Sequence, residues 1–173
     1  MKIALMAALA ALTLPAAASA RPGDIWQIES SPEYVVLHYG IPPTRGEQDM
    51  PGLMCHPHSL YEAVLFTDRH HYPVRQLHQD VWVNRAGRQA PWPMSMTIRS
   101  GAATQTFAAH GEMETDDELV MITATIPNSS PIVTTFQHTG QLRLSAVGEA
   151  PSMPPAPLRL VRQFFTACAA LSH

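Results

Sequence analysis

The chain has 173 residues, a net charge of −3 with histidine counted as neutral, and a composition that is 46% hydrophobic. This length suffices for one domain with its own hydrophobic core. The weakly acidic balance argues against a nucleic-acid-binding surface and against an anionic-membrane surface. Nine histidines are many for this length, and they are the compositional feature that most needs an explanation.

The first twenty residues have the pattern of a bacterial secretory signal peptide. Lys2 precedes an apolar run that Pro15 interrupts, and an Ala-Ser-Ala sequence then supplies the small residues that a signal peptidase recognises. We expect residues 1–20 to be removed and residues 21–173 to form a single β-rich domain in the periplasm or outside the cell. No later apolar run reaches the length of a transmembrane helix, so we expect no membrane span after cleavage.

Residues 25 to 147 show the apolar–polar alternation of an antiparallel sheet, interrupted by Pro, Gly and Asn. The segment 118–126 is apolar on both faces, which predicts a central strand. Leu142 and Leu144 alternate with Arg143, so the leucines are expected to face inward. We expect a mainly β fold, either an antiparallel β-sandwich or a barrel-like sheet, with strands at 25–29, 34–39, 59–67, 74–84, 94–99, 103–109, 118–126, 132–138 and 141–147.

The segments between these strands carry turn residues. The sequences Pro-Asn-Ser-Ser-Pro at 127–131 and His-Thr-Gly at 138–140 indicate turns, and therefore three consecutive antiparallel strands at the end of the β region. The acidic run 112–118 is typical of a solvated hairpin turn. The segment 40–52 is long, polar and Pro-rich, and we expect it to be a loop.

A Pro-rich connector precedes a change of period from two to nearly four. Leu158, Val161, Phe165 and Cys168 follow one another at i, i+3, i+7 and i+10. This spacing predicts one C-terminal amphipathic helix at about 157–171. Its apolar face is expected to pack on the sheet.

Cys55 and Cys168 are the whole cysteine content of the chain. In an oxidising compartment, two cysteines are most simply explained by one disulfide bond. Such a bond would fasten the C-terminal helix to the first third of the domain. The alternatives are a nucleophilic cysteine or a metal thiolate, because His56 and His58 lie beside Cys55.

The first candidate metal site lies around Cys55. Met50, Met54, His56 and His58 offer thioether and imidazole donors, which suit copper(I) or zinc. Cys55 itself is expected to be used in the disulfide. The alternative interpretation of this segment is an ordinary loop that leads into a strand.

The second candidate site comprises Asp68, His70, His71, His78 and Asp80. By strand parity Asp68 and His70 share one face, as do His78 and Asp80, so a hairpin could bring the two histidines and the two carboxylates together. The group could hold zinc, or the His78–Asp80 pair could perform the acid–base chemistry of a small hydrolase. The alternative is that these are polar side chains on solvent-facing strand positions.

Four aromatic residues, Tyr61, Tyr72, Trp82 and Trp92, could form a ligand-binding surface. Aromatic side chains can supply binding hot spots only where they are exposed. Core packing is the alternative interpretation of the same residues.

The order of the C-terminal elements also resembles a known family. The strand with Leu142-Arg-Leu144, the Pro157-Leu158 helix start and the Phe165-Thr-Ala-Cys168 sequence resemble small periplasmic proteins of the invasion-associated locus B type. The resemblance covers the region from the last strand onward together with the general layout, and this chain has fewer cysteines than the family pattern. It implies a non-enzymatic envelope protein and carries over no catalytic residue.

The residues therefore favour an exported, non-catalytic binding or envelope-associated protein. We expect it to act on an envelope or protein partner, without a cofactor and without nucleic acid. A periplasmic copper- or zinc-binding protein is the alternative, and a small hydrolase is the weaker one.

Overall fold

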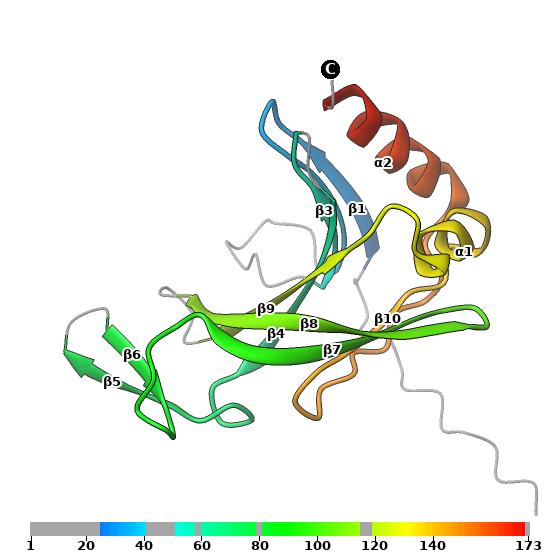
Figure 1. Cartoon of the computed structure of the whole chain (residues 1–173). Coiled ribbons are helices and arrows are strands. Elements are labelled where there is room, and N and C mark those ends of the chain that lie inside the picture. Colours follow the sequence, from blue (N-terminus) through cyan, green and yellow to red (C-terminus); the bar gives the residue numbers. More distant parts are fainter. Residues whose placement is uncertain (1–24, 41–50, 58–59, 79–80, 115–118, 172–173) are drawn as a thin grey trace, which may run out of the picture.

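A computed structural model describes residues 25–40, 51–57, 60–78, 81–114 and 119–171, with the side chain of residue 78 excepted (Figure 1). The expected signal peptide lies outside these residues. No helix in the described part of the chain is long and apolar enough to cross a membrane. The elements are β1 (Ile25–Ser30), β2 (Val35–Gly40), β3 (Gly52–Cys55), β4 (Tyr61–Asp68), β5 (Val74–His78), β6 (Val81–Asn84), β7 (Trp92–Ser100), β8 (Ala103–Glu114), β9 (Leu119–Ile126), α1 (Pro131–Thr139), β10 (Arg143–Ser145) and α2 (Leu158–Leu171).

The fold is mainly β, as predicted, and its main body is one antiparallel sheet. Eight strands lie in the order β1-β2-β3-β4-β9-β8-β7-β10, and β5 and β6 form a separate two-stranded ribbon. The sheet curls so far that β10 contacts β4 on its inner side. The structure therefore corresponds to the barrel-like alternative. The strand β9 lies between β4 and β8, which confirms the central strand expected from its two apolar faces.

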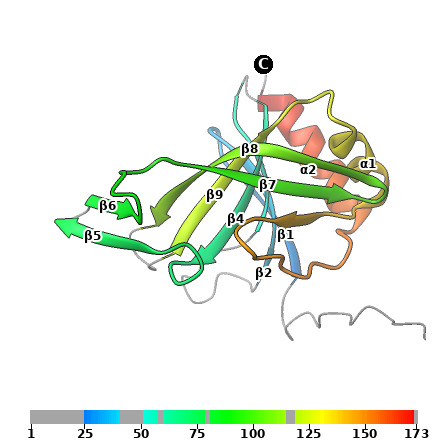
Figure 2. The same ribbon diagram turned by 60° about the horizontal axis from the view of Figure 1, so that its bottom comes forward.

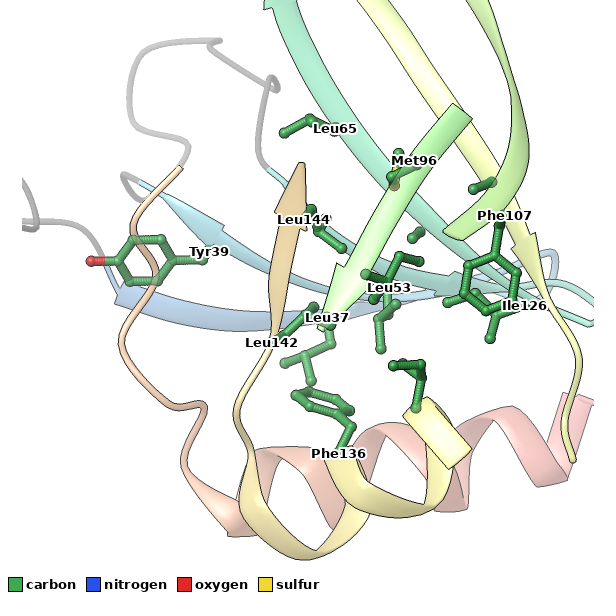
Figure 3. Packing of buried hydrophobic residues seen from close by; sticks show 14 of the residues in the cluster. Leu37, Tyr39, Leu53, Leu65, Met96, Phe107, Ile126, Phe136, Leu142 and Leu144 are labelled. Atoms are coloured by element: carbon green, nitrogen blue, oxygen red, sulfur yellow. The ribbon is translucent and has the colours of Figure 1, made fainter. Parts of the chain in front are cut away.

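Both helices cover the inner face of the curled sheet (Figure 1). Helix α2 packs against β1 and β2, α1 packs against β7 and β8, and the two helices contact each other. In Figure 3, Phe136 of α1 points into the same apolar cluster as Leu37 of β2 and Leu144 of β10. The connector before α2 is fixed to the first strand, because the Trp26 indole donates to the Pro154 carbonyl over 2.8 Å. The helices thus close the open side of the sheet.

Helix α1 corrects the strand expected at 132–138. Ser130 is its N-cap and accepts a hydrogen bond from the backbone N–H of Ile132, while Pro131 occupies the first turn. Gly140 ends the helix in the left-handed conformation, with φ 64°. The β-branched run that suggested a strand is overridden by these two end signals. As a result, the three consecutive strands expected here are absent, and β10 pairs with β7 instead.

The remaining strands and α2 agree with the sequence prediction in part. The strand β3 was not expected, because it is only four residues long and follows the segment interpreted as a loop. The expected strand 74–84 is divided into β5 and β6. The inward positions of Leu142 and Leu144 are confirmed, and α2 lies where the helical period placed it. Residues 115–118 of the expected acidic turn lie outside the description, but β8 and β9 pair up to Glu114 and Leu119 on either side.

Candidate functional site

The two cysteines form a disulfide bond between β3 and α2. Cys55 and Cys168 are both buried, with their Cα atoms 6.0 Å apart, and no described cysteine is free. This confirms the expected fastening of the helix to the sheet. It also rules out Cys55 as a nucleophile or a metal ligand while the bond is intact.

The first candidate metal site is only partly described. Met50 and His58 lie outside the described residues. Strand alternation places Met54 on the face of β3 opposite to Cys55. The His56 ring lies 3.2 Å from the Glu33 carbonyl oxygen through Nδ1 and 3.7 Å from the Glu62 carboxylate through Nε2. Of the donors described here, Cys55 is held in the disulfide and the His56 ring has protein partners of its own.

The second candidate site does not assemble through the expected hairpin. The strand β4, which ends at Asp68, pairs with β3 and β9, whereas β5 pairs with β6. The Asp68 carboxylate accepts a hydrogen bond of 2.7 Å from the His70 backbone N–H and lies 3.8 Å from its ring. The His71 ring lies 2.7 Å from Glu149, a partner that sequence reasoning missed because the two are far apart in the chain.

The remaining members of this second group lie wholly or partly outside the described residues. Asp80 lies outside the described residues, and His78 belongs to β5 with its side chain outside the description. Within the residues that the structure describes, no three His, Cys, Asp or Glu side chains come together as a metal-binding group.

The four candidate aromatic residues do not share one exposed surface. Trp92 is fully buried, and its indole donates to the Arg88 carbonyl over 2.8 Å. Tyr72 packs on Trp92 with the ring centroids 5.6 Å apart. Tyr61 lies 5.1 Å from Phe165 of α2, where burial raises the pKa of its phenol. Of the four, Trp82 alone lies on the β5–β6 ribbon, where it is half-buried.

A buried histidine with a carboxylate partner, which the sequence did not indicate, lies on β1 and β2. His38 is almost fully buried, and its Nε2 lies 3.3 Å from the partly exposed Glu29 carboxylate. Burial lowers the pKa of His38, and the negative charge of Glu29 opposes that shift. The amide nitrogen of the cross-strand neighbour Gln27 is buried and has no hydrogen-bond partner among the described residues. Because the imidazole is not accessible to a substrate, we assign the pair a structural role.

The β5–β6 ribbon projects from the end of the sheet farthest from the helices (Figure 2). We call residues 69–78 and 81–88, which contain this ribbon, its flanking turns and four arginines, the basic arm. Leu77 and Val81 lie next to its tip and are 50% and 36% exposed. An isolated two-stranded ribbon is marginally stable on its own, so its attachment to the body decides whether it keeps its shape.

The root of the basic arm is attached on both sides. Before β5, the contact of 2.7 Å between the His71 ring and the Glu149 carboxylate ties the first turn to the segment after β10. After β6, the Asn84 side chain accepts hydrogen bonds from the backbone N–H groups of Ala86 and Arg88 over 3.0 and 3.1 Å. The buried Trp92 holds the end of this second turn through the Arg88 carbonyl. Two of the candidate site residues, His71 and Trp92, thus attach the basic arm to the body of the fold.

No protein-family model, no curated protein and no solved structure matches this chain.

Proposed function

We propose that the chain is an exported, non-catalytic binding protein of the cell envelope, which contacts its partner through the basic arm. The observation that carries the proposal is the braced ribbon with exposed Leu77 and Val81 at its far end (Figure 2). Aliphatic side chains cost free energy when they are exposed to water, and a projecting ribbon that presents them is suited to a binding contact.

Two further features support export. The Cys55–Cys168 disulfide is stable in oxidising compartments such as the periplasm. The N-terminal pattern of Lys2, the apolar run and the Ala-Ser-Ala site predicts a leader that is cleaved before Arg21. The layout resemblance to periplasmic proteins of the invasion-associated locus B type implies the same class of function.

The metal-binding and hydrolase hypotheses have less support. His56, His70 and His71 each pair with a separate carboxylate. Asp80 and the His78 side chain lie outside the described residues. The basic arm, in contrast, exposes Leu77 and Val81, and a binding protein needs such exposed apolar side chains to contact its partner.

Cell fractionation tests the proposal. The full-length chain with a C-terminal tag, expressed in a bacterial host, should begin at Arg21 after processing and be recovered with its disulfide formed in the periplasmic and envelope fractions. The variant Leu77→Ser/Val81→Ser should be exported equally well but should lose at least half of its envelope-bound share.

Leu158→Ser is the matched control, because Leu158 is 40% exposed but lies on α2 and not on the arm. It should fractionate as the wild-type chain does. Retention of an unprocessed chain in the cytoplasm would contradict export. An unchanged envelope share in the arm variant would contradict the role of the arm.

A further inference from the structure

Two exposed arginines lie directly opposite each other on β7 and β10. Arg143 of β10 is the cross-strand partner of Arg99 of β7, and both side chains are exposed. Leu142 and Leu144, on either side of Arg143, are buried, so both arginines lie on the outer face of the sheet. Residues directly opposite each other have their Cβ atoms about 5 Å apart, which brings both guanidinium groups within reach of one small ligand. We call Arg99 and Arg143 the arginine pair.

The arginine pair has no compensating negative charge around it, although the whole chain has a net charge of −3. Neither guanidinium forms an ion pair with any residue that the structure describes. Residues 81–111 and 119–148 contain no Asp or Glu, and they supply β6, β7, most of β8, β9, α1 and β10. The first acid on β8 is Glu112, which is eight residues past Thr104 and therefore about 26 Å farther along the strand. Like charges directly opposite each other in a sheet are unfavourable, so an anion bound between the two arginines would relieve their repulsion.

Further hydrogen-bond donors lie beside the arginine pair. Thr104 of β8 is the other cross-strand neighbour of Arg99, and it is exposed on the same face. Arg99 donates through Nε to the Gly101 carbonyl over 3.3 Å, which fixes the guanidinium and leaves its other N–H groups for a ligand. The side chain of Gln141 also lies beside Gly101. Arg143, Arg99 and Thr104 thus form one row of donors across three neighbouring strands.

The number and charge of these donors favour a phosphate monoester over a carboxylate. A carboxylate has two oxygens and one negative charge, and a single arginine can satisfy it through two parallel hydrogen bonds. A phosphate monoester has three terminal oxygens and a charge of about −1.5 to −2 at pH 7, which matches two arginines and a hydroxyl group. A sulfate monoester has the same shape but a single negative charge, so it should bind less tightly.

We propose that the arginine pair and Thr104 bind a terminal phosphate monoester group, carried by a sugar or by a lipid. The two guanidinium groups hold phosphate oxygens between β7 and β10, and the Thr104 hydroxyl donates to a further oxygen. The site is open to solvent, so binding is reversible and weakens as salt screens the charges. Figure 2 shows this end of β7 beside α1, at the opposite end of the sheet from the basic arm. The site therefore goes beyond the proposed function and does not depend on the arm.

NMR titration of the processed, disulfide-bonded chain at low salt tests this. Glucose 6-phosphate should shift the Nε–H signals of Arg99 and Arg143 in a saturable manner, and glucose 6-sulfate should bind several-fold more weakly. Arg99→Gln and Arg143→Gln should each weaken binding about tenfold, because each variant lacks charge-assisted hydrogen bonds to the phosphate. Arg143→Lys keeps the charge but not the planar fork, so its affinity should be intermediate.

Arg162→Gln is the matched control, because it removes an exposed arginine from α2 and should bind as the wild-type chain does. Without ligand, Arg143→Gln should not lower the urea midpoint, because it removes a contact between like charges.

Phosphatidylcholine vesicles that contain phosphatidic acid, a lipid with a terminal phosphate, distinguish the two carriers. Co-sedimentation with these vesicles but no shift with glucose 6-phosphate would assign the phosphate to a lipid, and the reverse would assign it to a sugar. Equal affinity for glucose 6-phosphate and glucose 6-sulfate, wild-type affinity in Arg99→Gln and Arg143→Gln, or binding of neither carrier would overturn the inference.

Discussion

At the scale of single residues, His38 shows how burial sets the charge of a histidine. Its imidazole is almost fully buried, and this burial lowers its pKa below the ordinary value of 6.5 although Glu29 lies 3.3 Å away. As the pH falls through 6.5, the unfolded chain binds a proton that the folded chain does not. The free energy of unfolding should therefore decrease as the pH falls below 6.5, until the pH reaches the pKa of the folded state.

We predict that Glu29→Gln lowers the pKa of His38 further, because the variant lacks the carboxylate that favours the protonated ring. NMR titration of the imidazole resonances should show the His38 midpoint below 6.5 in the wild-type chain and lower still in the variant. Glu62→Gln, next to His56, is the control and should leave the His38 midpoint unchanged. A rise of that midpoint in Glu29→Gln would refute the electrostatic assignment.

At the scale of elements, the ends of α1 decide its structure. Ile132 and Val133 favour a strand when they are considered locally, since β-branched side chains are restricted in helices. In the fold, both are buried in a helix that Ser130 begins and Gly140 ends. The Ser-Pro start and the final glycine could have predicted this helix from the sequence.

We predict that Gly140→Ala destabilises the chain more than Gly87→Ala does. Both glycines have positive φ, 64° and 74°, so alanine costs about 1 kcal/mol at either position through backbone strain. At Gly140 a Cβ would also overlap the Ala156 carbonyl oxygen, whereas at Gly87 it meets nothing within 4 Å. The expected loss of unfolding free energy in urea is about 3 kcal/mol for Gly140→Ala and about 1 kcal/mol for Gly87→Ala. Equal losses would show that the contact with Ala156 does not constrain the end of α1.

Elements with a strong local pattern were predicted, and elements decided by pairing were not. The alternation in β10 and the helical stripe of α2 each require only neighbouring residues, so both were found. Whether residues 74–84 join the main sheet depends on β4 pairing with β9, which local alternation does not encode. The basic arm could not be predicted for the same reason, although its arginines are visible in the sequence.

At the scale of the whole molecule, one hydrophobic cluster joins the two halves of the curled sheet to both helices. Its members come from β1 at the start of the described chain and from α2 at its end. Within the described part of the chain, several histidines lie beside separate carboxylates, such as His38 beside Glu29 and His71 beside Glu149. The Cys55–Cys168 disulfide links β3 covalently to α2, and so joins the first part of the sheet to the C-terminal helix.

We predict that reducing the Cys55–Cys168 bond lowers the free energy of unfolding by about 4 to 5 kcal/mol. The bond joins residues 113 positions apart, and in the chain-entropy model opening so long a loop restores that much freedom to the unfolded chain. The folded state should persist, because Val161 and Phe164 still bury α2 against the sheet. Urea unfolding with and without reductant measures the change, and Cys55→Ala/Cys168→Ala, which should not respond to reductant, is the control. If the wild-type midpoint does not move on reduction, α2 is held by packing alone and the fastening role of the disulfide is wrong.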